Sequence, residues 1–197
     1  MSTFYLIRHA SNDLVGHSIA GRKPGVHLNE RGQDEAQRLA RALEGSGIKR
    51  VFSSPLERAL ETAQPLARAL GVAVETLEAI KEIDFAGWTG RAFADLKQDP
   101  VWQQWNSFRT GARAPNGETI LEVQARMVGA VRQLWEKFPN DKIAIVSHGD
   151  PLRTIIFYYL GISLDFVSRI EISPASYTIL KLESWRPQIA ALNVTAA

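Results

Sequence analysis

Two of the chain's four histidines closely follow short apolar runs that are typical of buried strands. The first run is residues 4–7, and Arg8 separates it from His9. The second run is residues 143–146, and Ser147 separates it from His148. A neutral imidazole can attack phosphorus, and an arginine guanidinium presents a fork of N–H donors that matches phosphate oxygens. Histidines accompanied by arginines make a poor metal site, because the arginines repel a cation. The pattern therefore indicates an anion-binding site.

Arg58 lies at the start of a helical pattern that follows a third, shorter apolar run, Val51-Phe52. Alone, a histidine at a strand end usually caps or packs, and an arginine at a helix start usually forms a surface ion pair. The functional interpretation therefore depends on several of these residues meeting at one place in the fold. The carboxyl ends of parallel strands meet at one edge of a sheet, where such folds bind ligands. The residues expected to meet there are Arg8, His9, Arg58 and His148.

Strand and helix signals alternate along the chain. Short apolar strands are expected at residues 4–7, 51–52, 72–77 and 143–146. The tail is expected to add an edge strand or hairpin at residues 168–172, 177–182 and 188–192. Strands that are apolar throughout are typical of a parallel sheet buried on both faces. This order predicts an α/β fold, a single three-layer α/β/α sandwich with a mostly parallel central sheet.

Helices with start or stop signals are expected between these strands. One begins after Asn29, the next ends at Gly71, and the longest opens with a capping-box sequence that starts at Thr119. A further helix is expected to begin with Asp150 as its cap and Pro151 in its first turn. The expected buried stripe of the longest helix is Leu121, Ala125, Val128, Val131, Trp135 and Phe138.

The composition excludes several classes of protein. Of the 197 residues, 45% are hydrophobic and 22% are charged, as in ordinary globular proteins, and none is cysteine, which excludes disulfides and cysteine-ligated metals. The 23 basic and 21 acidic residues are interleaved, so no nucleic-acid-binding patch is expected. The longest apolar stretch, residues 155–160, is too short to span a membrane, and no signal peptide precedes it. We therefore expect a cytoplasmic protein without nucleic-acid or membrane partners.

Residues 6–10 read LIRHA, which resembles the RHG-type signature of the histidine phosphatase superfamily, the phosphoglycerate-mutase-like phosphatases. Segments similar to other motifs of that family follow in the same order at residues 28–33, 53–59, 82–88, 117–119 and 147–149. Six motifs in one order and spacing form a specific signal that covers nearly the whole chain. The resemblance implies a phosphoglycerate-mutase-like fold in one domain, residues 1–197, with about residues 78–116 forming part of a cover over the active site.

Three positions depart from the family pattern. Ala10 stands where the family usually has glycine, which is a common exchange. Val15 stands where the family often has an asparagine of the phosphate pocket. Asn12 lies nearby but does not match that position, so the role is not transferred to it. The segment FAGWTG, at residues 85–90, replaces the family's FGxWEG and affects the substrate side.

The resemblance implies catalysis through a phosphohistidine. His9 would be the nucleophile, and Glu82 would be the acid that protonates the leaving alkoxide and then activates water, with Asp84 in reserve. The phosphate oxygens would be held by Arg8, Arg58 and His148. Further substrate contacts are assigned to Gly21, Arg22 and Gly149. No metal and no cofactor are implied, because the arginines supply the positive charge.

Three functions stay open. The leading hypothesis is a metal-independent phosphomonoesterase that acts on a small phosphorylated metabolite. The second is a cofactor-dependent phosphoglycerate mutase, and the third is a non-catalytic domain that binds a phosphorylated ligand. Mutases of this family carry long insertions after the glutamate segment, whereas only residues 90–115 lie there in this chain, which favours hydrolysis. The substrate and the oligomeric state stay open, with a homodimer as one option.

Residues 99–115 are rich in large side chains. Two interpretations are equally weighted: the aromatic residues line the pocket, or they pack on the domain. If they line the pocket, they favour a substrate with an apolar or ring-bearing leaving group. The residues concerned are Trp102, Trp105, Phe108, Arg109 and Arg113.

Overall fold

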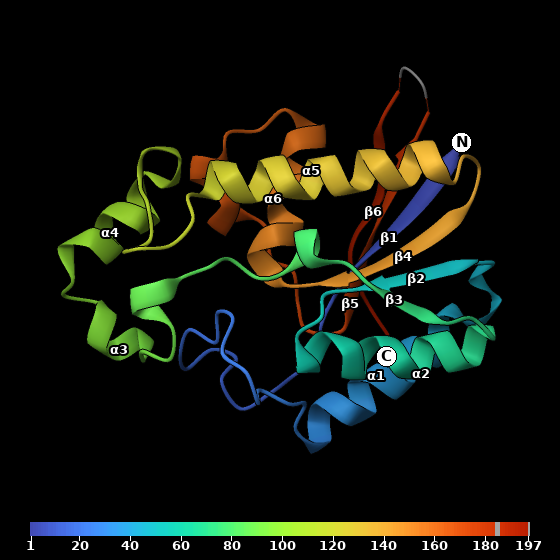
Figure 1. The fold of residues 1–197 in the computed structure, drawn as a ribbon, viewed down its shortest axis with the longest axis horizontal. Helices are drawn as coiled ribbons and strands as arrows, with labels where there is room; N and C mark the ends of the chain where they lie inside the picture. The colour runs from blue at the N-terminus through green and yellow to red at the C-terminus, as the bar shows by residue number, and fades with distance from the viewer. Residues whose placement is uncertain (184–185, 197) are drawn as a thin grey trace.

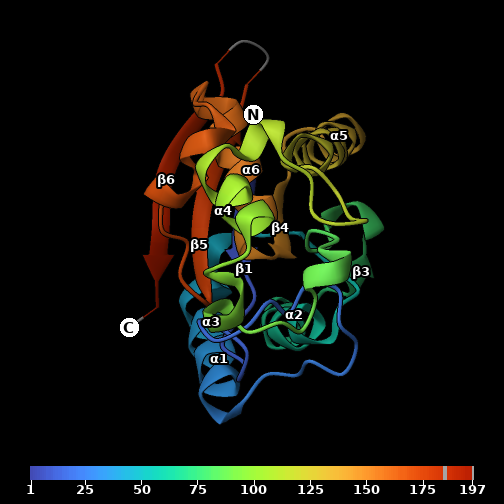
Figure 2. The ribbon, with the colours of Figure 1, turned by 90° about the vertical axis from the view of Figure 1, so that its left-hand side faces the viewer.

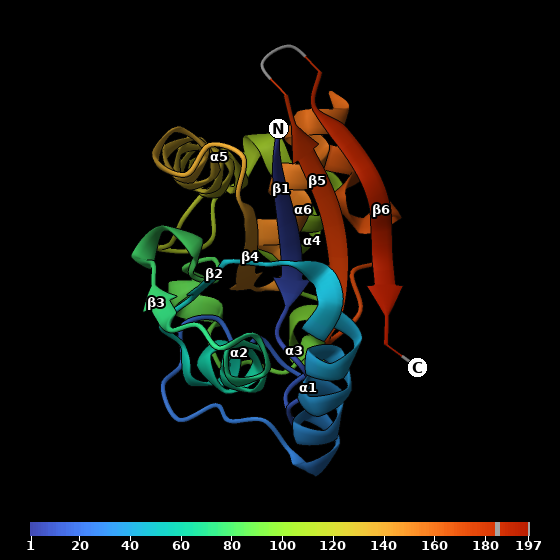
Figure 3. The ribbon, with the colours of Figure 1, turned by 90° about the vertical axis from the view of Figure 1, so that its right-hand side faces the viewer.

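The computed structural model describes residues 1–183 and 186–196. Its centre is a six-stranded sheet in the order β3-β2-β4-β1-β5-β6, which runs from left to right in Figure 3. The first four strands of this order pair in parallel. Strand β5 pairs antiparallel with both of its neighbours, β1 and β6. The strands are β1 (Ser2–Arg8), β2 (Arg50–Ser53), β3 (Val74–Thr76), β4 (Lys142–Ser147), β5 (Ser176–Leu182) and β6 (Gln188–Thr195).

Helices cover both faces of this sheet. In Figure 1, α5 lies above the sheet and α1 and α2 lie below it, while α6 packs in the same core as α5. The α-helices of the described residues are α1 (Glu30–Leu43), α2 (Glu57–Leu70), α3 (Phe93–Leu96), α4 (Pro100–Ser107), α5 (Ile120–Lys137) and α6 (Gly149–Leu160). The predicted three-layer α/β/α sandwich is confirmed.

The apolar run in β1 is buried on both sides because successive strand residues point to opposite faces. Phe4 and Leu6 pack in the core on the α5 and α6 side. Tyr5 and Ile7 pack in the second core, against α1 and α2. Burial on both faces fixes the strand at the centre of the sheet and brings its carboxyl end to the edge that carries the candidate site.

Several local signals form as predicted. Asn29 caps α1, where its side chain accepts the backbone N–H of Gly32 at 2.9 Å. Thr119 and Glu122 form the predicted capping box of α5. In α2, the helix ends at Gly71, whose φ of +67° suits glycine. These caps set the ends of the helices that flank the site.

The prediction of the buried stripe of α5 was partly wrong. Leu121 and Ala125 are exposed, and the buried side chains include Ile120, Val123 and Met127. Both stripes are apolar at helical spacing, so periodicity alone does not choose between them. In the tail, residues 177–182 and 188–192 lie in the expected hairpin, but residues 168–172 form no strand and instead overlap a 3₁₀ helix, Leu164–Arg169.

The start of α6 also differs from the prediction. The helix begins at Gly149, and Asp150 lies within its first turn rather than at its cap. The Asp150 carboxylate accepts hydrogen bonds from Arg153 at 2.8 Å and from Arg109 at 3.1 Å. Two arginine partners outweigh a single backbone N–H, because hydrogen bonds between charged groups are the stronger ones.

Residues 78–116, called here the irregular segment, contain α3, α4 and three short 3₁₀ turns. In Figure 2, α3 and α4 lie in front of the sheet. Backbone hydrogen bonds tie the segment to the loop after β1: the N–H of Gly90 donates to Ile19 at 2.7 Å, and that of Phe93 donates to His17 at 3.0 Å. Within the described residues, no helix combines the length and the apolar character needed to cross a membrane.

Candidate active site

His9 lies immediately beyond β1 and is 4% exposed. Its backbone N–H donates to Ser147 at 2.9 Å, which continues the pairing of β1 with β4. Its Nδ1 lies 2.8 Å from the carbonyl oxygen of Ala10. Because a carbonyl only accepts, Nδ1 carries the ring proton. Nε2 therefore carries the lone pair, which accepts a hydrogen bond from Nε of Arg58 at 3.3 Å and is the atom that can attack phosphorus.

The surroundings of His9 keep its ring neutral. Burial lowers its pKa well below the usual value, and the charges of Arg58 and Arg8 lower it further. The pKa of His148 is lowered in the same way, first by burial and then by Arg58. The two rings lie close together, with centroids 5.1 Å apart. Neutral His9 has the protonation state that a nucleophile requires.

Arg58 is fully buried at the start of α2 and is held in a defined orientation. Its Nη2 donates to the carbonyl of Gly21 at 2.8 Å, and its Nε donates to Nε2 of His9 at 3.3 Å. In Arg8, Nη1 donates to the carbonyl of Ile172 at 2.6 Å. Both guanidinium groups are thus oriented by backbone carbonyls, and each keeps a buried nitrogen without a partner in the described chain.

Four buried nitrogen atoms of the site lack hydrogen-bond partners among the described residues. Buried polar atoms are nearly always paired in proteins, so such a cluster needs an explanation. Nε2 of His148 lies 2.8 Å from the Ser54 hydroxyl, which can donate to it and leave the proton on Nδ1. The cluster then presents donors only, as an anion site requires. The atoms are Arg8 Nε, Asn12 Nδ2, Arg58 Nη1 and His148 Nδ1.

Asn12 is the member of this cluster that the sequence interpretation left without a role. It is 4% exposed, and its Oδ1 accepts the backbone N–H of Leu14 at 3.0 Å, which fixes the amide with Nδ2 as the remaining donor. No motif in the sequence marks this residue. Only its burial and its unpartnered amide nitrogen identify it.

The cluster opens into a cavity of about 280 Å³. Such a volume is at the small end for ligand sites and suits a small metabolite. Leu14, Val15 and Ile19 come from the loop after β1, and Gly149, Asp150 and Arg153 come from α6. The irregular segment contributes Glu82, Phe85, Phe93, Trp102, Asn106 and Arg109.

Glu82 lines this cavity and is suited to donate a proton at neutral pH. Its pKa is raised to about 7, chiefly by burial and then by the nearby charge of Asp150, against the opposing charges of Arg58 and Arg8. Its Oε1 accepts the backbone N–H of Ile83 at 2.9 Å. A carboxyl group with this pKa can give up a proton and take one back near pH 7.

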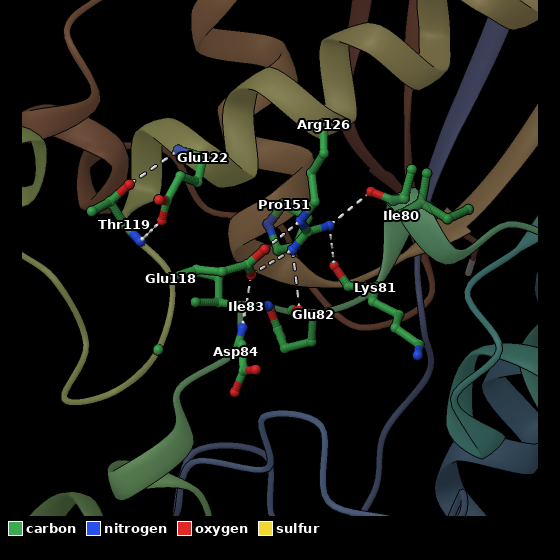
Figure 4. Close-up of polar contacts among 12 residues, drawn as sticks. Ile80, Lys81, Glu82, Ile83, Asp84, Glu118, Thr119, Glu122, Arg126 and Pro151 are labelled. Carbon is green, nitrogen blue, oxygen red and sulfur yellow. Dashed lines mark hydrogen bonds and ion pairs between the residues drawn. The ribbon is translucent and has the colours of Figure 1, made fainter.

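Arg126 of α5 holds the backbone that carries Glu82, as Figure 4 shows. Its Nη1 donates to the carbonyls of Ala79 and Lys81 at 2.7 and 2.8 Å, and its Nη2 donates to the carbonyl of Glu82 at 3.1 Å. The remaining N–H groups donate to the carboxylate of Glu118 at 2.9 and 3.0 Å. All five donors of the guanidinium are therefore used, three of them on the carbonyls of residues 79–82 and two on Glu118.

Glu118 links this arrangement to two further groups. Its Oε2 accepts the backbone N–H of Asp84 at 2.9 Å and Nη2 of Arg22 at 3.0 Å. Nε of Arg22 donates to the carbonyl of Glu82 at 2.9 Å. Arg22, Glu118 and Arg126 thus fix the backbone of residues 82–84 through hydrogen bonds.

The structure separates the residues that were assigned from the sequence. Arg8, His9, Arg58, Glu82, Gly21 and Gly149 line the cavity, and His148 contributes to the cluster of unpartnered donors. Arg22 is not among the residues that line the cavity. Asp84, the reserve acid, does not line it either; its carboxylate accepts the N–H of Ala86 at 3.0 Å and pairs with Arg22 at 3.5 Å.

The large side chains of residues 99–115 divide between the two interpretations given above. Trp102 and Arg109 line the cavity. Trp105 is fully buried in the core, where it packs edge-on against Phe85 and Trp88. Outside the cavity, Phe108 is 53% exposed. The last member of the set, Arg113, pairs with Glu122 at 2.7 Å.

Comparison with known proteins places this geometry in a family. Residues 4–195 match the histidine phosphatase superfamily, branch 1. Phosphoserine phosphatase 1 of Hydrogenobacter thermophilus is 28% identical over 200 residues, which cover 99% of this chain and 93% of the relative. A protein described as a probable phosphoglycerate mutase of Proteus mirabilis is 29% identical over 167 residues, covering 82% of this chain and 76% of the relative.

Solved structures resemble the whole chain. A mutant phosphoserine phosphatase of Entamoeba histolytica, in complex with phosphoserine, superposes with a TM-score of 0.90 at 26% identity and covers 98% of this chain and 97% of its own. The same phosphatase in complex with 3-phosphoglyceric acid gives a TM-score of 0.90 at 27% identity and covers 99% of this chain and 98% of its own. The fold and the phosphoglycerate-mutase-like family expected from the motifs are confirmed.

Proposed function

This chain belongs to branch 1 of the histidine phosphatase superfamily, and on that basis we propose that it is a metal-independent phosphomonoesterase. It acts through a phosphohistidine on a small phosphorylated metabolite, with residues 78–116 as part of the cover. The observation that carries the proposal is the set of four buried donors without partners in the described chain around neutral His9, with an acid whose pKa is about 7 in the same cavity. Relatives that are phosphatases, one of them with phosphoserine bound, support it.

In the first step, Nε2 of His9 forms a bond to phosphorus and the bond from phosphorus to the ester oxygen breaks. The protonated Glu82 gives its proton to that oxygen, so the product leaves as a neutral alcohol. Arg8, Arg58 and His148 donate to the three non-bridging oxygens, where negative charge is held in the transition state. Asn12 supplies the fourth of these donors.

In the second step, the ionised Glu82 takes a proton from water while the water oxygen attacks the phosphorus. The bond from phosphorus to Nε2 of His9 breaks, inorganic phosphate leaves, and both side chains return to their starting protonation states. In both steps Gly21 acts through its carbonyl, which orients Arg58. Arg22 does not contact the substrate; it positions Glu82 by donating to its backbone carbonyl.

A panel of phosphomonoesters, supplied to the purified protein in quench-flow experiments, tests this proposal. We expect release of inorganic phosphate and a transient protein phosphate that survives alkali and is lost in acid, as expected for phosphohistidine. On the same preparation, interconversion of 3- and 2-phosphoglycerate with bisphosphoglycerate added should be slow relative to phosphate release. Faster isomerisation would establish a mutase instead, and binding without turnover on the whole panel would establish a non-catalytic domain.

A further inference from the structure

A second pair of arginines borders the cavity beside the phosphate cluster. Arg109 reaches it from the irregular segment and Arg153 from α6, and Asp150 lies between them with ion pairs of 3.1 and 2.8 Å. Both arginines are largely buried, with side chains 10% and 20% exposed. The proposed phosphoryl transfer uses neither of them.

The charges around the cavity exceed what a phosphate ester needs. Among the described residues, four arginines line it, namely Arg8, Arg58, Arg109 and Arg153, against one buried anion, Asp150, when Glu82 is in its acid form. They leave one positive charge more than a phosphomonoester dianion balances. Since an uncompensated buried charge is costly, the cavity is complementary to a ligand with a second negative group.

Arg153 is placed to meet such a group close to the phosphate. A side-chain carbon at Gly149 would stand 3.4 Å from Nη1 of Arg153 and 3.5 Å from Nε of Arg8, so the two guanidinium groups flank this glycine. Nε of Arg153 donates to the carbonyl of Ile170 at 2.9 Å, which orients the group. In the described chain its Nη2 has no hydrogen-bond partner and remains available to a ligand.

We propose that Arg153, supported by Arg109, forms a carboxylate subsite, and that the substrates are monophosphate esters of small hydroxy acids. The proposal rests on the proposed phosphatase function and narrows its substrate class. A carboxylate matches the planar fork of a guanidinium and supplies the one further negative charge. The apolar wall formed by Leu14, Phe85 and Trp102 would cover the short carbon chain between the two anionic groups.

Two pairs of esters that differ at the carboxylate test this inference with the wild-type protein. One pair is 3-phosphoglycerate and glycerol 3-phosphate, and the other is phosphoserine and phosphoethanolamine. We expect kcat/KM to be about tenfold to a hundredfold higher for the carboxylate-bearing member of each pair, as for a hydrogen bond between charged groups. A ratio near one in both pairs would overturn the inference while the proposed phosphatase stands. No phosphate release from any of the four esters, or from p-nitrophenyl phosphate, would overturn the proposed function itself.

Variants then assign the preference to Arg153. In Arg153→Met the ratio within each pair should fall to near one, and in Arg153→Lys it should lie between that value and the wild-type ratio. Because the ratio is formed on one preparation, a general loss of activity or folded protein does not move it. The control is Arg132→Met, an exposed arginine of α5, which should keep the wild-type ratio. If Arg153→Met keeps the wild-type ratio within each pair, Arg153 does not recognise the carboxylate and the subsite is refuted.

Discussion

Two regions of the chain supply the candidate site: Arg8 and His9 stand at the end of β1 and His148 follows β4, whereas Glu82 and Arg109 belong to the irregular segment. The first group is placed by the backbone pairing of neighbouring parallel strands. The second group is placed by side chains from other elements, through ion pairs and hydrogen bonds to backbone carbonyls.

This contrast separates two contributions to the proposed reaction. The sheet edge supplies the nucleophile and the phosphate donors, and its geometry follows from topology. The irregular segment supplies the proton, and its geometry depends on a polar network centred on Arg126 and Glu118. Changes at the sheet edge should therefore affect all substrates alike, whereas changes to the network should matter most for esters whose leaving group needs a proton.

The largest effect is expected from His9→Ala, at the sheet edge. Removal of the nucleophile should lower kcat by four orders of magnitude or more, on the order of the losses seen when a catalytic nucleophile is removed, for every ester alike. Phosphate release measures the loss, and circular dichroism checks the fold. The matched control is His27→Ala, an exposed histidine that pairs with Glu61, which should keep wild-type turnover. Near-normal turnover by a folded His9→Ala protein would refute the phosphohistidine mechanism.

Glu82→Gln tests the contribution of the irregular segment. Loss of the acid should lower kcat/KM, which reports the first step, by about 10² to 10⁴-fold for alkyl phosphates but much less for p-nitrophenyl phosphate, whose phenolate leaves without protonation. The kcat of both esters should fall, because Glu82 also activates water in the second step. In the wild type, the raised pKa of about 7 keeps Glu82 protonated below that pH. Activity on alkyl esters should therefore fall as pH rises above about 7.

The acid side of the same pH profile reports on His9. Because the pKa of His9 is depressed, its ring stays neutral below pH 6.5, and activity should persist into the acidic range. The descending limb above neutrality should disappear in Glu82→Gln. An unchanged pH profile in that variant would assign the proton transfer to another group, with Asp84 the first to test.

Arg126→Lys keeps the positive charge but cannot make all five hydrogen bonds of the guanidinium, three to the carbonyls of residues 79–82 and two to Glu118. We expect kcat/KM for alkyl phosphates to fall by about tenfold to a hundredfold, the range that a small misplacement of a catalytic group can produce. The kcat/KM for p-nitrophenyl phosphate should change little. Arg132→Lys on the same helix is the control, and an equal loss on both kinds of ester in Arg126→Lys would indicate a purely structural role.

Asn12→Ala removes one donor from the sheet-edge cluster. A single hydrogen bond to a charged oxygen is worth about tenfold or somewhat more in kcat/KM, and the loss should be equal for alkyl and aryl esters. Asn12→Asp should be worse, because a carboxylate would face the phosphate. Steady-state kinetics and inhibition by vanadate measure both variants. Wild-type kinetics in Asn12→Ala would remove Asn12 from the site.

The sheet-edge side was the more predictable one, for a physical reason. The apolar run of β1 demands burial on both faces, and parallel pairing with β4 then brings His9 and His148 to one edge. Both steps follow from the apolar character of the two runs and from the parallel pairing that such runs favour. The two residues could therefore be brought together from the sequence without any knowledge of loops.

The irregular segment offered no such local rule. Glu82 was identified by resemblance, but its position depends on Arg126, on a different helix, and its pKa depends on burial and on Asp150. The same long-range pairing explains why Asp150 does not cap α6, since Arg109 and Arg153 hold its carboxylate. Asn12 was given no role from the sequence because an unpartnered donor is visible only once its neighbours are in place.

The smallest effect, and the last of these predictions, concerns metal removal. In the proposed mechanism the charge that a metal would supply comes from Arg8 and Arg58, whose guanidinium groups adjoin the phosphate position and would repel a cation there. Extensive dialysis against a chelator should therefore leave kcat and KM unchanged for alkyl and aryl esters. If activity is lost and a divalent ion restores it, the ester dependence locates the ion. A loss on all esters would place the ion at the sheet edge, and a loss confined to alkyl esters would place it with Glu82 and Asp150, at the leaving group.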